Sequence, residues 1–360
     1  MSSIVGNILK ISIFGESHAK AIGLTIDGLP AGIKIYEEKI KEDLLKRNPK
    51  DEYSTKRHEE DKVNFLCGVF NGVTTGAPIT FIIENNDVDS SSYTKGEIRP
   101  SHADLVNHEK YNGFNDYRGG GFSSGRTTAS LVVLGSICKD ILAQKGIKIG
   151  THIKSIHGVF DEEFDLKNIE NQLENINNSL FPVISEDAKH KMTEQIKIAR
   201  ENADSVGGIL ESIILGLPIG LGEPYFDSLE SYISQLLFSI GGVKAVEFGD
   251  GVEFANKLGS EVNDQLQYEG ENIKYLSNHN GGINGGISNG QPVVIKTTVK
   301  PTPSIGVAQQ SINVETNKNI NLLINGRHDP CIVQRVRAVV DALLAYAIVD
   351  MLMVKESKNI

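Results

Sequence analysis

The chain repeats one pattern in IGLTIDGLPAG (residues 22–32) and LESIILGLPIG (residues 210–220): a strand-like apolar run followed by a Gly-Leu-Pro-x-Gly turn. A stretch with apolar residues at helical spacing follows each turn, over residues 40–45 and residues 229–237. Strands and amphipathic helices differ in apolar period, so the same order of elements is predicted twice. We infer a diverged internal duplication.

Further elements extend the repeat. Residues 75–79 and residues 289–293 each place a Gly-x-Pro turn before a strand-like run. A long helix then ends each half, over residues 131–142 and residues 329–351. Asp329 is expected to cap the second helix, because a proline follows it at the first helical position. These patterns predict the α+β class, with helices packed against antiparallel β-hairpins about a pseudo-twofold axis, rather than a parallel α/β sheet.

The duplication favours one compact body over two independent domains, although 360 residues would allow two. We expect a single domain over residues 1–354, with a first half at about 1–150 and a second at about 205–354. Residues from about 155 to 200 are rich in Glu, Asn and Lys and are expected to form a solvated insertion without chemistry. Residues 355–360 are a C-terminal tail.

Composition excludes several classes of protein. The formal net charge of −10 argues against a nucleic-acid surface, which needs a basic stripe. No apolar run approaches the ~20 residues that span a membrane, and the N-terminus lacks a signal-peptide core, so a cytoplasmic protein without membrane contact is expected. The three cysteines are widely separated and the nine histidines form no metal-binding pair with a third ligand, so no metal is expected.

Residues 118–128, RGGGFSSGRTT, combine bare backbone, hydroxyls and guanidiniums immediately before a helix-like segment. Converging N–H groups and the positive end of a helix dipole favour an anion, and phosphate is the expected occupant. The alternative is a flexible surface loop before an ordinary helix. In an acidic chain an anionic substrate requires arginines gathered locally, and those beside glycine-rich turns are the candidates: Arg47, Arg99, Arg126 and Arg327.

Polar loops that contain the remaining candidate residues are spread over nearly the whole chain. They are GESH (15–18), RPSHAD (99–104), the glycine-rich loop, NHNGGINGG (278–286), KPTPS (300–304) and GRHDP (326–330). In this order they resemble chorismate synthase, and the match of several loops together is far more specific than any one motif.

The resemblance implies a β-α-β sandwich, usually a homotetramer, and a carbon–oxygen lyase of the shikimate pathway of aromatic amino acid biosynthesis. Such an enzyme converts 5-enolpyruvylshikimate 3-phosphate to chorismate by 1,4-trans elimination of phosphate. It needs reduced FMN, with NADPH as a candidate reductant. The alternatives are a flavin-binding paralogue without turnover and a phosphoryl-transfer enzyme, although the chain has no Gly-x-x-x-x-Gly-Lys-Ser/Thr run.

The resemblance also assigns catalytic residues. His18 would donate a proton toward the departing phosphate, and His102 would protonate or steady the reduced flavin. From the residues alone, His18 is equally a polar turn residue, and His102 equally a loop histidine bonded to Asp104. Asp329 is carried over as catalytic, and it remains an N-cap candidate.

Binding residues follow from the same match. The FMN-binding residues would be Phe122, Ser123, Ser124, Gly241, Gly242, Gly285, Lys300, Pro301, Thr302, Pro303, Ser304 and Arg327. Substrate or NADP would contact Ser17, Arg47 and Arg126. Lys300 is otherwise an ordinary solvated lysine, and Arg47 otherwise a helix-terminal cation facing the dipole.

The chain departs from the family pattern at a few positions. Arginine is usual where Phe122 and Glu52 stand, alanine at Gly125, glutamate at Thr127 and glycine at Ala19. Loss of two arginines removes positive charge from a site for a trianionic substrate. A change in the affinity for phosphate ligands, or in the residues that contact the flavin, is therefore expected.

Overall fold

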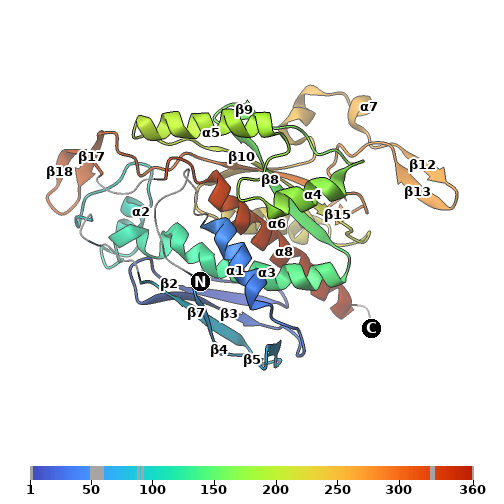
Figure 1. Ribbon diagram of the computed structural model, residues 1–360, viewed down its shortest axis with the longest axis horizontal. Coiled ribbons are helices and arrows are strands. Elements are labelled where there is room, and N and C mark those ends of the chain that lie inside the picture. The colour runs from blue at the N-terminus through green and yellow to red at the C-terminus, as the bar shows by residue number, and fades with distance from the viewer. Residues whose placement is uncertain (1–2, 49–60, 87–89, 91–92, 325–328, 359–360) are drawn as a thin grey trace.

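The computed structural model describes residues 3–48, 61–86, 90, 93–324 and 329–358. Two antiparallel sheets enclose a layer of helices, and the C-terminal helix passes through the centre of that layer (Figure 1). Within the described part of the chain, no helix is long and apolar enough to cross a membrane.

The first sheet is five-stranded and every neighbouring pair in it is antiparallel. Its strands, in spatial order, are β1 (Ile4–Val5), β2 (Lys10–Gly15), β3 (Ala21–Asp27), β7 (Ile79–Glu84) and β4 (Val63–Cys67). Alternate side chains on β7, those of Ile79, Phe81 and Ile83, are fully buried. This period of two turns one face of the sheet toward the helices.

The second sheet is also five-stranded and antiparallel. Its strands, in spatial order, are β11 (Val243–Phe248), β16 (Val293–Val299), β10 (Gly208–Leu215), β8 (Lys148–Ile156) and β9 (Val159–Phe160). On β16 every second residue from Val293 to Val299 is buried, as its apolar alternation predicts.

Four helices carry the core between the sheets (Figure 1). They are α1 (Glu37–Arg47), α3 (Thr128–Gln144), α6 (Leu229–Phe238) and α8 (Val333–Lys358). Helix α8 is buried on all sides as far as Leu352, apart from Arg335, which is typical of a central helix. It crosses α3 so closely that a Cβ atom at Gly135 would lie 2.2 Å from that of Ala342.

Further elements surround this body. The helices among them are α2 (Asp104–Lys110), α4 (Ile169–Asn178), α5 (Glu186–Glu201) and α7 (Gly259–Val262), and the 3-10 turns are η1 (Arg118–Ser123), η2 (Gly125–Thr127), η3 (Tyr225–Asp227) and η4 (Gly251–Asn256). Four antiparallel strand pairs complete the set: β5 (Val69–Phe70) with β6 (Val73–Thr74), β12 (Leu266–Glu269) with β13 (Asn272–Tyr275), β14 (Ile283–Asn284) with β15 (Ile287–Ser288), and β17 (Gln309–Asn313) with β18 (Lys318–Leu322).

The α+β expectation is confirmed, because helices pack against antiparallel sheets throughout. Both expected ends of the last helix are wrong, because α8 also continues to Lys358 and so includes part of the tail expected at residues 355–360. Helix α8 begins at Val333, and the carbonyl of Ile332 accepts hydrogen bonds from the N–H groups of Arg335 and Val336. Asp329 lies before this turn and pairs with Arg335 instead of capping the helix.

A buried ionic cluster joins the outer helices to the second sheet. The ring of His152, on β8, has no solvent exposure and lies between two carboxylates. Nδ1 is 2.8 Å from Asp161, which also accepts the N–H of Ser185 at the start of α5, and Nε2 is 2.9 Å from Glu211 on β10. Lys154 lies 3.8 Å from Glu211 and 2.6 Å from the exposed Glu163, so its charge is shared between these two acids.

A second buried carboxylate, that of Asp350 on α8, ties down the N-terminal segment. It accepts the N–H groups of Asn7, Ile8 and Leu9 at 2.8–2.9 Å and the hydroxyl of Tyr232 at 2.6 Å. These donors belong to two parts of the chain, so one charged side chain on α8 joins the segment before β2 to α6.

We expect Asp350→Asn to lower the free energy of unfolding by about 1–3 kcal/mol, because the amide has one acceptor oxygen and places a donor against donors. Urea denaturation measures the change. Glu356→Gln on the same helix removes an exposed pair with Lys145 and should change stability by less than about 0.5 kcal/mol. Equal effects from the two variants would contradict the role given to Asp350.

Candidate active site

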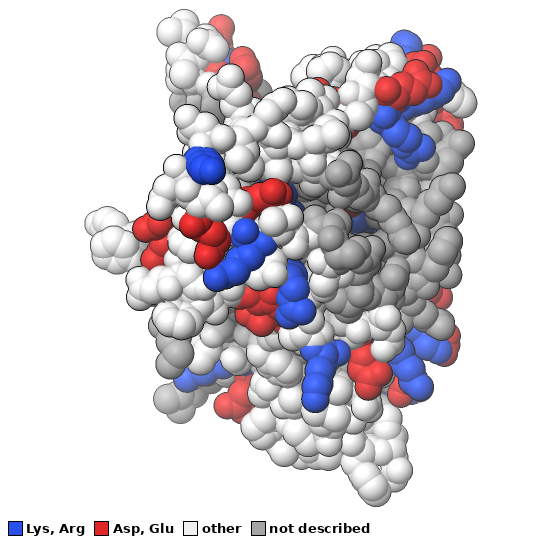
Figure 2. All heavy atoms as spheres, turned by 90° about the vertical axis from the view of Figure 1, so that its left-hand side faces the viewer, with Lys and Arg blue, Asp and Glu red and all other residues white. Residues whose placement is uncertain are grey.

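A cavity of about 530 Å³ lies where the ends of α1, α3 and α8 meet the loops that follow α6 and β16. Among the described residues that line it, the cations are Arg47, Arg99, Arg126, Lys244, Lys300 and Arg335, and the acid is Asp329. On the outer face drawn in Figure 2, by contrast, Lys and Arg side chains are interspersed with Asp and Glu. Positive charge is therefore concentrated inside the cavity of an acidic protein.

The glycine-rich loop forms one wall. Gly119, Gly120 and Gly121 have φ of 60°, 89° and 55°, in the left-handed region that favours glycine. The loop continues into η2, where the Ser124 hydroxyl accepts the N–H of Arg126, and then into α3. The expected order of glycine-rich loop and helix is confirmed.

Both candidate histidines lie against this loop. A Cβ atom at Gly119 would lie 2.7 Å from Cε1 of His18, and one at Gly120 would lie 3.1 Å from Cε1 of His102. His18 does not itself line the cavity, but its ring packs edge-on against Tyr93, which does, with 5.2 Å between the ring centroids. Successive glycines thus allow two imidazoles to approach the same stretch of backbone.

Substitution of Gly119 tests this close approach. We expect Gly119→Ala to lower turnover by roughly 10–10²-fold, because its Cβ would push the His18 ring away and the site depends on placement within about 1 Å. Steady-state phosphate release measures the loss. Gly72→Ala is the matched control, since the φ of Gly72 is also left-handed, at 74°, and no atom lies within 4 Å of its Cβ position. Equal activity of the two variants would show that the contact has no role.

His102 is held by an acid that is itself held by an arginine. Nδ1 of His102 is 2.7 Å from Oδ1 of Asp104, and the Arg99 guanidinium donates to both carboxylate oxygens at 2.7 and 2.8 Å. Burial alone would raise the pKa of Asp104, but the hydrogen bonds from Arg99 and His102 outweigh it and hold the pKa well below its usual range. The charged carboxylate therefore orients the His102 ring. The loop-histidine alternative described this bond correctly, and the bond is compatible with a catalytic role.

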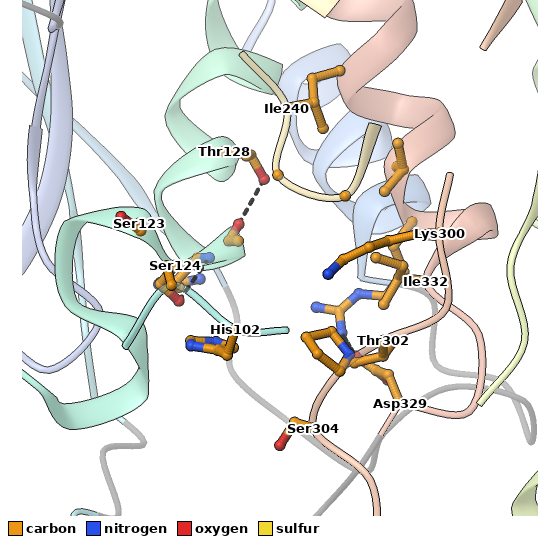
Figure 3. A pocket seen from close by; sticks show the side chains of 18 of the residues that line it. His102, Ser123, Ser124, Thr128, Ile240, Lys300, Thr302, Ser304, Asp329 and Ile332 are labelled. Atoms are coloured by element: carbon orange, nitrogen blue, oxygen red, sulfur yellow. Dashed lines mark hydrogen bonds and ion pairs between the residues drawn. The ribbon is translucent and has the colours of Figure 1, made fainter. Parts of the chain in front are cut away.

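The opposite wall follows β16. The backbone N–H of Lys300 donates to the carbonyl of Gly242, and its Nζ donates to the Ser101 carbonyl at 2.8 Å. Burial, followed by the nearby charge of Lys244, lowers the pKa of Lys300. Figure 3 shows Lys300, Thr302, Asp329 and Ile332 across the cavity from His102 and Ser124. Lys300 is therefore not an ordinary solvated lysine.

Part of the cavity wall is suited to a flat aromatic ring. Its apolar side chains are those of Ile240, Ile332, Val336 and Val339. Gly241 adds bare backbone, with no atom within 4 Å of its Cβ position.

The two candidate anion-binding arginines are clamped in place. Arg47 ends α1, and its Nη2 donates to the Gly125 carbonyl at 2.7 Å, so its side chain points at the glycine-rich loop rather than serving only the helix dipole. Arg126 donates from Nε to Oδ1 of Asn85 at 2.9 Å. Both guanidiniums also face the carboxylate of Asp61, which was not anticipated from the sequence.

Asp329 lies at the base of α8. Its Oδ2 is 2.5 Å from Nη1 of Arg335, and Nε of Arg335 donates to the Arg47 carbonyl at 3.1 Å. Arg335 was also missed from the sequence. The sequence offered little to single it out, because Gln334, Arg337 and Asp341 are polar residues of the same helix.

Comparisons with known proteins agree with this geometry. The family model for chorismate synthase matches residues 9–353. A chorismate synthase of Korarchaeum cryptofilum is 42% identical over 355 residues, which is 97% of each chain. That of Lachnoclostridium phytofermentans is 44% identical over 356 residues, which is 98% of this chain and 95% of the other.

The chain belongs to the chorismate synthase family.

A crystal structure of chorismate synthase matches the fold with a TM-score of 0.77 and 28% identity, and covers 98% of this chain and 93% of the other. Family membership confirms the resemblance seen in the loops and the α+β fold. It also confirms the expected enzyme class, a carbon–oxygen lyase of aromatic biosynthesis with chorismate synthase function.

The structure gathers most of the residues carried over from the family. Those that line the cavity are Arg47, His102, Ser123, Ser124, Arg126, Gly241, Gly242, Lys300, Pro301, Thr302, Pro303, Ser304 and Asp329. Ser17 is buried behind Gly119, and its backbone N–H donates to the Gly121 carbonyl. Phe122 and Gly285 are not among the lining residues, and Gly285 lies in the β14–β15 turn near the start of α6. Arg327 lies outside the described residues.

The departures from the family pattern lie mostly outside the cavity wall. Thr127 is buried and its hydroxyl donates to the Ser124 carbonyl, and the Ala19 carbonyl accepts a hydrogen bond from Asn85. Of the described departures, Gly125 alone lines the cavity, and its carbonyl is the acceptor for Arg47. Glu52 lies outside the described residues. Arg47 uses only the backbone carbonyl of Gly125 in this bond, which an alanine at that position would also supply.

Proposed function

We propose that this chain eliminates phosphate from 5-enolpyruvylshikimate 3-phosphate in the cavity beside the glycine-rich loop, with reduced FMN as its cofactor. The observation that carries the proposal is the approach of His18 and His102 to successive glycines at a wall that also contains Arg47 and Arg126. Elimination of an allylic phosphate needs a proton donor at the leaving oxygen and positive charge for the anion. The site has both.

The residues present fit a flavin. A wall of Ile240, Val336 and Val339 beside the bare backbone of Gly241 suits an isoalloxazine face. The buried hydroxyl of Thr302 has no hydrogen-bond partner among the described residues, so it is available to a ligand. FMN would be held by Ser123, Ser124, Gly241, Gly242 and residues 300–304. Phe122, Gly285 and Arg327 remain predictions from the family pattern. When bound, the reduced flavin supplies the electron-rich partner that receives the ring hydrogen of the substrate.

The chain's own residues manage protons and charge. His18 donates a proton to the departing phosphate oxygen. His102 keeps Nδ1 toward Asp104, which leaves Nε2 on the side of Gly120 to hold or donate a proton. Arg47, Arg126 and, as a prediction, Arg327 neutralise substrate anions, with Ser17 in support. Asp329, paired with Arg335, completes the predicted catalytic set.

The remaining features of the proposal are carried over from the resemblance to the family. We propose a single domain over residues 1–354, a homotetramer and a cytoplasmic location, with NADPH as a candidate reductant. No nucleic-acid or membrane partner is proposed.

An anaerobic assay with photoreduced FMN tests the function. Phosphate and chorismate should appear in equal amounts from 5-enolpyruvylshikimate 3-phosphate. Folded protein that releases neither product would contradict the proposal. Tight FMN binding without elimination would identify a paralogue that has lost turnover.

A further inference from the structure

We propose that Asp61 is the resident counter-anion of the Arg47–Arg126 pair, and that a phosphate or carboxylate group of the substrate replaces it. The chemical class of the ligand rests on the proposed function. Asp61 lies just before β4, and its side chain is only 4% exposed. It contacts both arginines, which line the cavity, and is not itself among the lining residues.

The same edge of each guanidinium faces this carboxylate. Nη1 of Arg126 pairs with Oδ1 of Asp61, and Nη1 of Arg47 lies 3.8 Å from Oδ2. Two cations that converge on one small anion form the arrangement that binds phosphate and carboxylate ligands elsewhere in proteins. Asp61 therefore stands where a ligand anion would be stabilised.

Neither arginine depends on Asp61 alone for its orientation. Nε of Arg47 donates to the Thr128 hydroxyl at 3.1 Å, and its Nη2 donates to the carbonyl of Gly125. For Arg126, Nε and Nη2 donate to Asn85 and to the Glu84 carbonyl at 2.9 and 3.2 Å. Both guanidiniums thus keep anchors on the body of the protein if the carboxylate is exchanged for another anion.

The hydrogen bonds to Asp61 are incomplete. Its Oδ2 is buried and has no hydrogen-bond donor among the described residues, and 3.8 Å to Arg47 is an ion pair without a close hydrogen bond. A buried carboxylate with an unsatisfied oxygen is poorly compensated. A phosphate dianion has more acceptor oxygens and more charge, so it can engage both Nη1 groups more fully than Asp61 does.

The exchange would set the affinity and selectivity of the site. In the substrate-free protein Asp61 neutralises one of the two buried positive charges. An incoming anion must therefore compete with an internal carboxylate, which favours dianionic phosphate over weaker monoanions.

Binding of inorganic phosphate, followed by ³¹P nuclear magnetic resonance, tests the proposal on the full chain without cofactor. We expect Asp61→Asn to bind phosphate at least about fivefold more tightly than the unmodified chain, because the negative charge that competes for the two arginines is removed. Asp61→Glu, which keeps the charge, should stay within about twofold of the original affinity.

Asp43→Asn is the matched control. Asp43 lies on α1, four residues before Arg47, and its side chain is 10% exposed, but its partners are Lys46 and Lys139. The variant changes the net charge equally without touching the arginine pair. Its phosphate affinity should remain near that of the original chain.

Several outcomes would overturn the proposal. Weaker binding by Asp61→Asn would mean that Asp61 holds the arginines in place permanently. An equal increase in phosphate affinity in Asp43→Asn would show that the effect arises from net charge alone. If neither the original chain nor any variant binds phosphate, the two arginines do not form an anion site. If Asp61→Asn does not fold, Asp61→Ser is used, and unfolding of both would exclude a replaceable carboxylate.

The assay separates this inference from the proposed function. Phosphate binding does not require turnover, so tighter binding by Asp61→Asn with an inactive parent would retain the inference and reject the function. Normal chorismate formation by the parent, with unchanged phosphate affinity in Asp61→Asn, would retain the proposed function and reject the inference about Asp61.

Discussion

Replacement of His102 by alanine should lower the rate of phosphate and chorismate formation by about 10²–10⁴-fold, the usual contribution of a positioned proton donor. The ring is fixed through Nδ1 by Asp104, and its other edge lies beside Gly120 at the cavity wall. Alanine removes the only group of this side chain that can carry a proton. Single-turnover assays with photoreduced FMN measure the loss directly.

Two further variants make the result specific. His108→Ala, six residues along and outside the cavity wall, should retain activity. Asp104→Asn should also slow turnover and shift its pH profile, because an amide cannot stabilise a protonated imidazole as a carboxylate does. Unchanged turnover in folded His102→Ala would remove His102 from the mechanism.

Replacement of His152 by leucine should lower the free energy of unfolding by about 3–5 kcal/mol, because it leaves two buried carboxylates without their shared cation. Asp161 and Glu211 would then face each other across an apolar side chain, with Lys154 as the nearest remaining cation to Glu211. Urea denaturation measures the change. His190→Leu, at an exposed position on α5, should stay within about 0.5 kcal/mol of the parent.

The pH dependence of this cluster has a definite sign. Burial lowers the pKa of His152, but hydrogen bonds and charge from Asp161 and Glu211 outweigh it and raise the pKa above its usual value near 6.5. The cluster's other neighbours are Lys154, Lys296 and the ring of Phe164. A raised pKa stabilises the fold fully below about 6.5, and the contribution is lost as pH rises through the folded value.

The carboxylates of Asp161 and Glu211 affect the pH dependence of stability in the opposite direction. Burial raises their pKa values, but the hydrogen bonds from His152 dominate and lower both. Their contribution is present above the unfolded carboxyl pKa values and is lost as pH falls through the lowered ones. The unfolding free energy should therefore decline on both sides of mildly acidic pH, and His152→Leu should lack the decline above about 6.5. An identical alkaline decline in the variant would contradict this assignment.

Elements with a strong local period could be predicted from the sequence. Residues 131–142 lie within α3, and the alternation from Val293 to Val299 is that of β16. The identity of the loops also predicted that His102 and Lys300 belong to one site, and both line the same cavity. These features depend on the regular spacing of apolar residues and on motifs that are contained within a few residues.

Tertiary contacts decided the rest. Asp329 has the sequence of a helix cap, but Arg335 binds it and the helix starts at Val333. The insertion, expected to be without chemistry, contributes Asp161 to the His152 cluster, whose other acid lies 59 residues from the histidine. Asp61 and Arg126 are 65 residues apart.

The sequence by itself therefore determined the repeated order of strand, turn and helix, the family and most of the cavity's residues, because local periods and short motifs encode them. Only the tertiary structure decided which charges share a partner. The pairing of strands and the crossing of α3 and α8 bring distant residues together, and no local pattern records which carboxylate will meet which cation.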